Sequence, residues 1–148
     1  MKKNILIIGL SLILFNFYHI SVIAKNSYFE DGKKLFDNEN YKDSKFYFEK
    51  DIVFNPKSEN SYLYLAKVFK VEKNNNLEEN NLITVLLLNP KNEEAIYLLT
   101  LHSIRNSNFS KAKELISTFN SVCKKICSSE TELQSKLNSS LKSEWSKI

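Results

Sequence analysis

The chain has 148 residues, a length that fits one domain of ordinary size. Two glycines and two prolines are present, whereas hydrophobic residues make up 43% of the chain. This composition can bury a core but is poor in residues that sharp β-turns require, so it indicates helices. The formal net charge of +4 falls to +2 if an N-terminal segment with Lys2 and Lys3 is removed. Such a small basic excess argues against nucleic-acid binding.

Residues 1–24 have the three parts of a secretory signal peptide. Lys2 and Lys3 precede an apolar run over 5–15, and the segment ends in small residues up to Ala24. We expect cleavage after Ala24 and an exported bacterial protein that is periplasmic or secreted. The competing interpretation is an uncleaved inner-membrane anchor facing the periplasm, since apolar character continues for nearly the ~20 residues that a membrane helix needs.

A proline-containing motif repeats along the chain. Asn55-Pro56 returns as Asn89-Pro90, so the two prolines lie 34 residues apart. The proline ring disfavours helical geometry in the residue before it, and its missing N–H costs nothing in the first turn of a helix. Each Asn-Pro pair is therefore expected to end one helix and open the next, and the period indicates a repeat of two helices.

Apolar residues at helical spacing support this interpretation. Tyr62, Leu65, Ala66 and Phe69 follow the i, i+3, i+4, i+7 pattern of one helical face. Short connections make neighbouring helices antiparallel. The expected helices span 27–38, 41–54, 58–72, 76–88, 92–106 and 109–122.

A further helix is expected over 129–145. Ser129 and Glu132 form a capping-box pattern at its start, and apolar residues recur at every fourth position from Leu133 onward. A stack of helical hairpins exposes an apolar face at its end until another element covers it. We therefore expect this helix to cap the third hairpin.

The pattern around the prolines resembles the tetratricopeptide repeat (TPR). The matching residues are Tyr28, Gly32, Leu35, Tyr41, Ser44, Phe48 and Pro56, then Tyr62, Leu65, Ala66, Phe69, Leu82 and Pro90, then Ile96, Leu99, Phe109, Ala112 and Ile116. Asp31, Glu78, Thr100 and Ser103 depart from the residues that the family prefers, and the third repeat lacks a closing proline. The competing interpretation is a generic helical bundle.

The resemblance implies an all-α, right-handed α-solenoid of about three helical hairpins. The repeats would cover 25–124 as 25–57, 58–91 and 92–124, with a signal helix before them and the capping helix within 125–148. In this family the first helix of each hairpin lines a concave groove that receives a peptide or a partner helix.

Eight residues match groove-facing positions of the family: Phe29, Lys33, Leu63, Lys67, Lys70, Tyr97, Leu101 and Arg105. The apolar members would anchor a partner, and the basic members would favour an acidic segment or a free carboxylate. For each residue the alternative is a solvated lysine or a partly packed apolar side chain.

Cys123 and Cys127 are the candidates for covalent chemistry. The three residues between them differ from the two-residue spacing of redox and haem-attachment motifs, and His102 is too isolated in the sequence to complete a metal site. At helical spacing their Cα atoms would lie ~6 Å apart, which permits a disulfide if the helix end unwinds. We predict a structural disulfide that fixes the turn into the last helix; the alternative is a pair of free thiols.

The sequence holds no Gly-rich phosphate loop, no histidine beside a nucleophile and no paired carboxylates in an apolar setting. We therefore expect neither an enzyme nor a bound cofactor or metal. The leading hypothesis is a periplasmic adaptor or scaffold that binds a protein or peptide partner. The alternatives are a thiol redox or metal-delivery protein that uses the two cysteines, and a membrane-tethered TPR assembly factor if the leader is retained.

Overall fold

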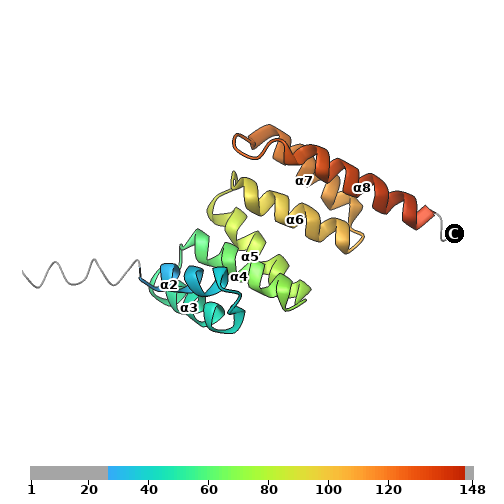
Figure 1. Ribbon diagram of the computed structural model, residues 1–148. Helices are drawn as coiled ribbons and strands as arrows, with labels where there is room; N and C mark the ends of the chain where they lie inside the picture. Colours follow the sequence, from blue (N-terminus) through green and yellow to red (C-terminus); the bar gives the residue numbers. More distant parts are fainter. Residues whose placement is uncertain (1–26, 146–148) are drawn as a thin grey trace, which may run out of the picture. The chain divides into compact units, whose positions relative to one another are not determined.

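The computed structural model describes residues 27–145, and over this range every regular element is an α-helix (Figure 1). The helices are α2 (Ser27–Asp37), α3 (Tyr41–Phe54), α4 (Glu59–Val71), α5 (Asn75–Leu88), α6 (Glu93–Arg105), α7 (Phe109–Val122) and α8 (Ser129–Trp145). Each lies within one residue of its expected bounds. None of the described helices has the length and apolar character needed to cross a membrane. The predicted leader, 1–24, lies outside the described residues.

The chain divides into two compact units, and the boundary falls between Ser61 and Tyr62 in the first turn of α4. In the described range, the first unit contains α2, α3 and the start of α4. The second contains the rest of α4 with α5, α6, α7 and α8. The repeat boundaries expected from the sequence stay a prediction.

The turn inside each hairpin is built in the same way three times. A residue with positive φ stands at each turn, 34 residues from the next: Glu39, Lys73 and Ser107, with φ of 60°, 56° and 56°. Each is followed by an asparagine whose side chain accepts the backbone N–H three residues further on: Asn40, Asn74 and Asn108. Such N-caps satisfy a backbone donor that the helix itself leaves unpaired. The third hairpin, which matches the family least in sequence, is therefore as regular as the others at its turn.

The corners between hairpins also recur, but with different chemistry. Asn55 and Asn89 end α3 and α5, and each donates its backbone N–H to the carbonyl four residues earlier. The third corner lies 34 residues further on and has Cys123 in this place, donating to the carbonyl of Phe119. The two prolines thus lie at corners as predicted, and a cysteine ends the third hairpin.

In the first unit, α2 and α3 approach closely at Gly32. A Cβ atom at this position would lie 2.8 Å from the ring of Phe48, which is fully buried. A small residue at position 32, one of the matches to the repeat pattern, therefore permits this close approach. At the end of α3 the buried carboxylate of Asp51 accepts the hydroxyl of Ser61 at 2.6 Å, so that this polar group has a partner.

In the second unit, the core runs from α4 to α8. One cluster joins α4, α5 and α6: Leu63, Ala66, Leu82, Val85, Ala95 and Leu99. The other joins α6, α7 and α8: Ile96, Ile104, Ala112, Ile116, Phe119, Leu133 and Leu137. The two leucines of α8 are 0% and 3% exposed, so α8 covers the third hairpin as expected.

Candidate functional site

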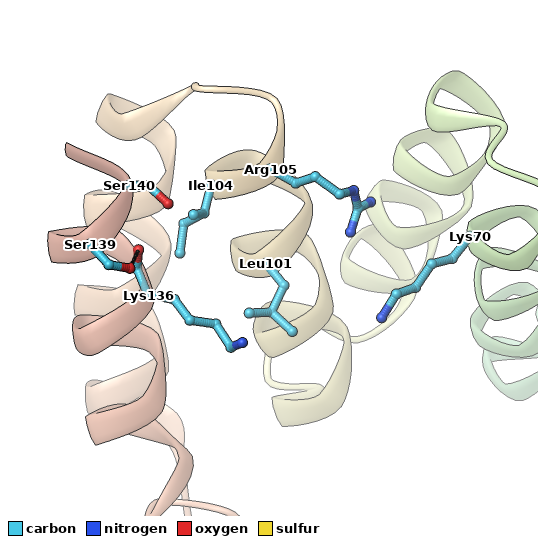
Figure 2. Close-up of a pocket in the computed structure, with 7 residues that line it drawn as sticks. All are labelled: Lys70, Leu101, Ile104, Arg105, Lys136, Ser139 and Ser140. Atoms are coloured by element: carbon cyan, nitrogen blue, oxygen red, sulfur yellow. Dashed lines mark hydrogen bonds between the residues drawn. The ribbon is translucent and has the colours of Figure 1, made fainter. Parts of the chain in front are cut away.

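Helices α4, α6 and α8 of the second unit line a pocket of about 330 Å³ (Figure 2). The lining residues are Lys70, Leu101, Ile104, Arg105, Lys136, Ser139 and Ser140. Three of them are cations, one from each helix, and two are apolar side chains of α6. The pocket can therefore accept an apolar group and present positive charge to an anion beside it.

The structure brings three of the eight predicted groove residues together in this pocket: Lys70, Leu101 and Arg105. The α8 side of the pocket was not predicted, because this helix was expected only to cap the third hairpin. Lys136, Ser139 and Ser140 lie at i, i+3 and i+4 of α8. This spacing places them on one helical face, and that pattern was the available signal.

Arg105 is held in place by a buried acid from α5. One guanidinium nitrogen of Arg105 lies 2.6 Å from Oε2 of Glu78, which is 2% exposed. A buried carboxylate is costly unless a charge and hydrogen bonds compensate it. Glu78, which departs from the family's small residue, thus obtains a partner and fixes the guanidinium at the edge of the pocket.

Buried His102 completes this network. Its Nδ1 lies 3.3 Å from Oε2 of Glu78, and its Nε2 lies 3.0 Å from the amide nitrogen of Asn106. His102 as a whole residue is 3% exposed. His102 therefore packs as a hydrogen-bonded core residue between α5 and α6.

Glu79, next along α5, ties that helix to α7. Its Oε1 accepts the ammonium group of Lys111 at 2.6 Å. This hydrogen bond lowers the pKa of the Glu79 carboxyl, although desolvation opposes the shift. Two adjacent glutamates of α5 are thus engaged by cations from α6 and α7.

Two further predicted groove residues are engaged inside the second unit. The ammonium of Lys67 lies 2.7 Å from Glu94 and 4.2 Å from the ring centroid of Tyr64. Leu63 is 4% exposed and belongs to the core. Our prediction that Leu63 faces a partner is corrected: α4 turns this side chain inward, against α5 and α6.

Tyr97 connects α6 to α8. Its hydroxyl donates to Oε2 of Glu132 at 2.9 Å, and its ring packs against the cluster of α6, α7 and α8. Partial burial raises the pKa of the Tyr97 phenol, and the Glu132 carboxylate adds to this effect. The predicted anchor for a partner therefore also anchors α8.

Phe29 and Lys33 belong to the first unit. The Phe29 ring centroid lies 5.9 Å from that of Phe48, and the Lys33 ammonium lies 2.6 Å from Asp37 on the same helix. Both side chains are partly exposed. Their predicted role in a groove is not tested by these contacts.

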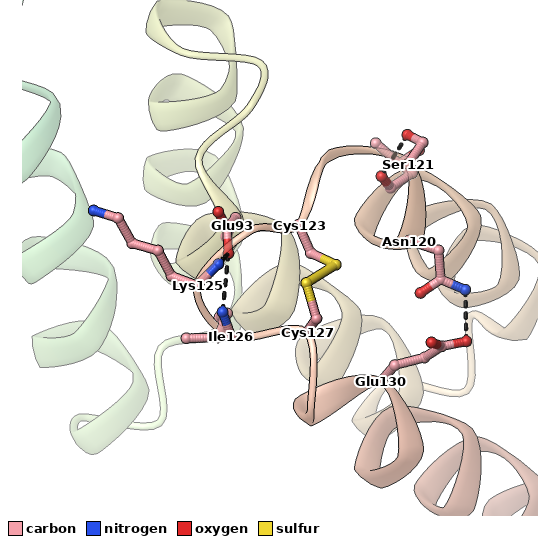
Figure 3. The surroundings of a disulfide bond; sticks show 9 residues. Glu93, Asn120, Ser121, Cys123, Lys125, Ile126, Cys127 and Glu130 are labelled. Atoms are coloured by element: carbon pink, nitrogen blue, oxygen red, sulfur yellow. Dashed lines mark hydrogen bonds between the residues drawn. A yellow bond between two sulfur atoms is a disulfide. The ribbon is translucent and has the colours of Figure 1, made fainter.

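Cys123 and Cys127 form a disulfide in the loop between α7 and α8, with their Cα atoms 5.3 Å apart (Figure 3). Helix α7 ends at Val122, so the chain leaves helical geometry before the first cysteine. The predicted disulfide and the unwinding that it requires are confirmed.

The same loop is held by a carboxylate from the first turn of α6. Oε2 of Glu93 accepts the backbone N–H groups of Lys125 and Ile126 at 2.9 and 3.1 Å, as Figure 3 shows. The hydrogen bond from Lys125 lowers the pKa of the Glu93 carboxyl, and that from Ile126 adds to it. A second contact joins α7 to α8, where the Asn120 amide donates to Glu130 at 2.6 Å.

Within residues 27–145, no group of three or more histidine, cysteine, aspartate or glutamate side chains is placed to hold a metal ion. The absence of a metal and a cofactor expected from the sequence concerns the whole chain and stays a prediction.

No protein-family model matches the sequence, and no curated protein matches it by sequence. Several solved structures match its fold. The first TPR domain of Spaghetti (RPAP3), bound to the HSP90 peptide SRMEEVD, has a TM-score of 0.71 and 16% identity, over 79% of this chain and 92% of that chain.

The type III secretion chaperone SycD of Yersinia enterocolitica, in complex with a peptide of the translocator YopD, has a TM-score of 0.69 and 10% identity, over 79% of this chain and 92% of that chain. The Sgt2 TPR domain of Aspergillus fumigatus has a TM-score of 0.63 and 11% identity, over 81% of this chain and 78% of that chain. The described helices of this chain therefore form hairpins in a TPR-like arrangement.

Proposed function

We propose that this chain is a non-enzymatic adaptor that binds an acidic peptide segment of another protein at the pocket of α4, α6 and α8. The observation that carries the proposal is the lining of that pocket. Leu101, which is partly exposed beside the buried Ile104, would take an apolar side chain of the peptide, and the three cations would take carboxylates.

The three cations differ in how firmly they are positioned. Arg105 is held by Glu78, so less side-chain entropy is lost when it binds a second carboxylate. Lys70 is exposed, and Lys136 lies 3.6 Å from Glu132 at the surface. A bound carboxylate would displace part of the hydration of these lysines and compete with Glu132, so we expect Arg105 and the apolar residues to give specificity.

The structural neighbours support a peptide-binding role for such a fold. The RPAP3 domain was solved with the peptide SRMEEVD, which has three acidic residues, and SycD was solved with a YopD peptide. Both structures have too low a sequence identity with this chain, 16% and 10%, for their ligands to be assigned to it. The proposed ligand therefore rests on the chemistry of the pocket.

The proposed setting is the bacterial periplasm or the medium. The leader pattern of 1–24 supports export, and a disulfide persists in an oxidising compartment. Mass spectrometry of the protein isolated from its host would read the N-terminal residue. A chain that starts at Lys25 supports cleavage after Ala24, and one that starts at Met1 supports the membrane-tethered alternative.

The binding proposal can be tested with fluorescein-labelled SRMEEVD as a model acidic peptide and an amidated SRMQQVN, labelled in the same way, as a match that lacks its carboxylates. Fluorescence anisotropy should show saturable binding of the acidic peptide to the mature chain, and binding at least tenfold weaker for the peptide without carboxylates. Lys70→Glu with Lys136→Glu should weaken binding by roughly tenfold, because two surface attractions become repulsions. Lys34→Glu with Lys113→Glu, two exposed changes on α2 and α7 at residues that do not line the pocket, is the control matched in charge. Equal binding of both peptides, or no binding of the acidic one, would contradict the proposal.

A further inference from the structure

The last helix forms one side of the pocket. Lys136, Ser139 and Ser140 come from α8, while the remaining lining residues come from α4 and α6. In Figure 2 the Lys136 side chain reaches toward Leu101 of α6. The pocket therefore keeps its complete lining only while α8 is packed against the rest of the second unit, the state that we call docked.

The packing of α8 on the rest of the unit is modest. Among its described side chains, Leu133 and Leu137 are the buried ones, and Leu141 is partly buried. The helix orders 17 residues, five of which are serine. Serine favours helix interiors less than alanine or leucine does, and an isolated helix of this length is marginal in water. Docking of α8 thus depends on how its start is held.

The start of α8 is held by the loop over 123–128. Ile126 packs partly against the core, and Glu93 accepts two backbone N–H groups of the loop. The disulfide closes a ring of five residues immediately before α8 begins at Ser129. At the two earlier corners, a proline restricts the backbone after Asn55 and Asn89. The third corner has a covalent bond that a thiol can open.

We propose that the Cys123–Cys127 disulfide controls the affinity of the α4–α6–α8 pocket by fixing α8, and that reduction by a dithiol weakens binding. This inference rests on the proposed peptide-binding function. With the ring open, the loop gains conformations that undock α8, and undocking removes Lys136 and both serines from the pocket. The apparent Kd rises in inverse proportion to the fraction of chains in which α8 is docked.

The reaction is a thiol–disulfide exchange. Cys127 is exposed and Cys123 is partly buried, so the thiolate of the dithiol attacks Sγ of Cys127. The Cys123–Cys127 bond breaks, a mixed disulfide forms at Cys127, and Cys123 leaves as a thiolate that takes a proton from water. The second thiol of the reductant then displaces Cys127 and closes a cyclic disulfide. The dithiol loses two electrons and the protein disulfide gains them.

The test compares oxidised and dithiothreitol-reduced mature chain by two measurements. Hydrogen-exchange mass spectrometry follows the amides of 129–145, and anisotropy follows labelled SRMEEVD. We expect the α8 amides to lose protection on reduction while those of α6 keep theirs. Binding should weaken by roughly five- to thirtyfold. The upper value is the change in the docking equilibrium of α8 if opening the five-residue ring returns all of its loop-closure entropy to the undocked state.

Two variants serve as controls. Cys123→Ser with Cys127→Ser should behave as the reduced chain and show no response to dithiothreitol, which excludes an effect of the reagent on the peptide. Glu93→Ala keeps the disulfide and removes the carboxylate acceptor, so it should lower α8 protection by a smaller factor. Its response to dithiothreitol should persist.

The outcomes separate this inference from the proposed function. Unchanged α8 protection on reduction overturns the inference whatever the peptide does. Equal affinity in both redox states overturns it as well and leaves the binding function standing. Absence of binding in the oxidised state overturns the function and the inference together.

Discussion

The carboxylate of Glu93 accepts the backbone N–H of Ile126 at 3.1 Å, so a residue in the first turn of α6 holds a loop that follows the next helix. The hydrogen bond from the backbone N–H of Lys125 lowers the pKa of this carboxyl below its ordinary value of 4.5, and the bond from Ile126 adds to this effect. A carboxylate with a lower pKa in the folded chain stabilises the fold above the unfolded pKa. This contribution is lost as the pH falls through the folded pKa.

Acidification should therefore loosen the loop and α8. We expect the amides of 125–145 to lose protection as the pH falls below 4.5, and Glu93→Ala to show lower protection with a weaker pH dependence. Hydrogen exchange between pH 6 and pH 3, corrected for intrinsic rates, measures this. Glu79 also has a lowered pKa, but it joins α5 to α7. A pH response confined to α5 and α7 would contradict the role given to Glu93.

Loss of the disulfide should also lower global stability. A ring of five residues reduces the entropy of the unfolded chain by an amount worth about 2 kcal/mol. Replacing both cysteines with serine should therefore lower Tm by roughly 5–10 °C. Circular dichroism melts of the variant and of the native chain, with and without reductant, measure the effect. If the variant has the same Tm as the oxidised native chain, the disulfide does not stabilise the protein by restricting its unfolded state.

Glu78 and Arg105 should behave as a coupled pair. Arg105→Ala leaves a buried carboxylate without its main cation, and we expect it to lower the free energy of unfolding by about 2 kcal/mol or more. Arg105→Ala combined with Glu78→Ala removes the stranded charge and should recover part of this loss. Urea unfolding of the two single variants and the double variant gives the coupling free energy. Additive effects would mean that His102, whose Nδ1 lies 3.3 Å from Oε2 of Glu78, satisfies this carboxylate without the arginine.

Gly32→Ala should destabilise the first unit. The added methyl group would lie 2.8 Å from the Phe48 ring, an overlap that costs about 1–3 kcal/mol, against a gain in helix propensity of about 1 kcal/mol. The net loss should be visible in urea unfolding. Lys34→Ala, an exposed change on the same helix, should alter the unfolding free energy by less than about 0.5 kcal/mol. A Gly32→Ala chain as stable as this control would show that α2 can shift away from α3.

The sequence predicted the helices well because their ends depend on local chemistry. The Asn-Pro pairs end α3 and α5, and the 34-residue period then fixes the positions of the remaining corners. Gly32 matched the repeat pattern, and the close contact of its position with the Phe48 ring shows why a small residue stands there. The two cysteines were paired correctly because four residues of separation limit their distance.

The site was harder to predict because it depends on contacts between distant residues. Nothing local pairs Glu78 with Arg105, which are 27 residues apart. The repeat pattern located Lys70, Leu101 and Arg105 but gave no reason to expect α8 beside them. Leu63 was assigned to the groove, but it lies in the core. Helix α4 is packed on several sides, so a shift of one residue along the helix separates a groove-facing position from a core position.

The tips of the three hairpins carry Glu39, Lys73 and Ser107, an acid, a base and a small neutral residue in the same left-handed conformation. All three side chains are exposed. Because side chains this different occupy one backbone geometry, these three positions tolerate different residue types. They are also exposed, away from the buried clusters. They are natural points at which to splice in reporter peptides or cross-linkable residues, so that a partner could be trapped without disturbing the protein that holds it.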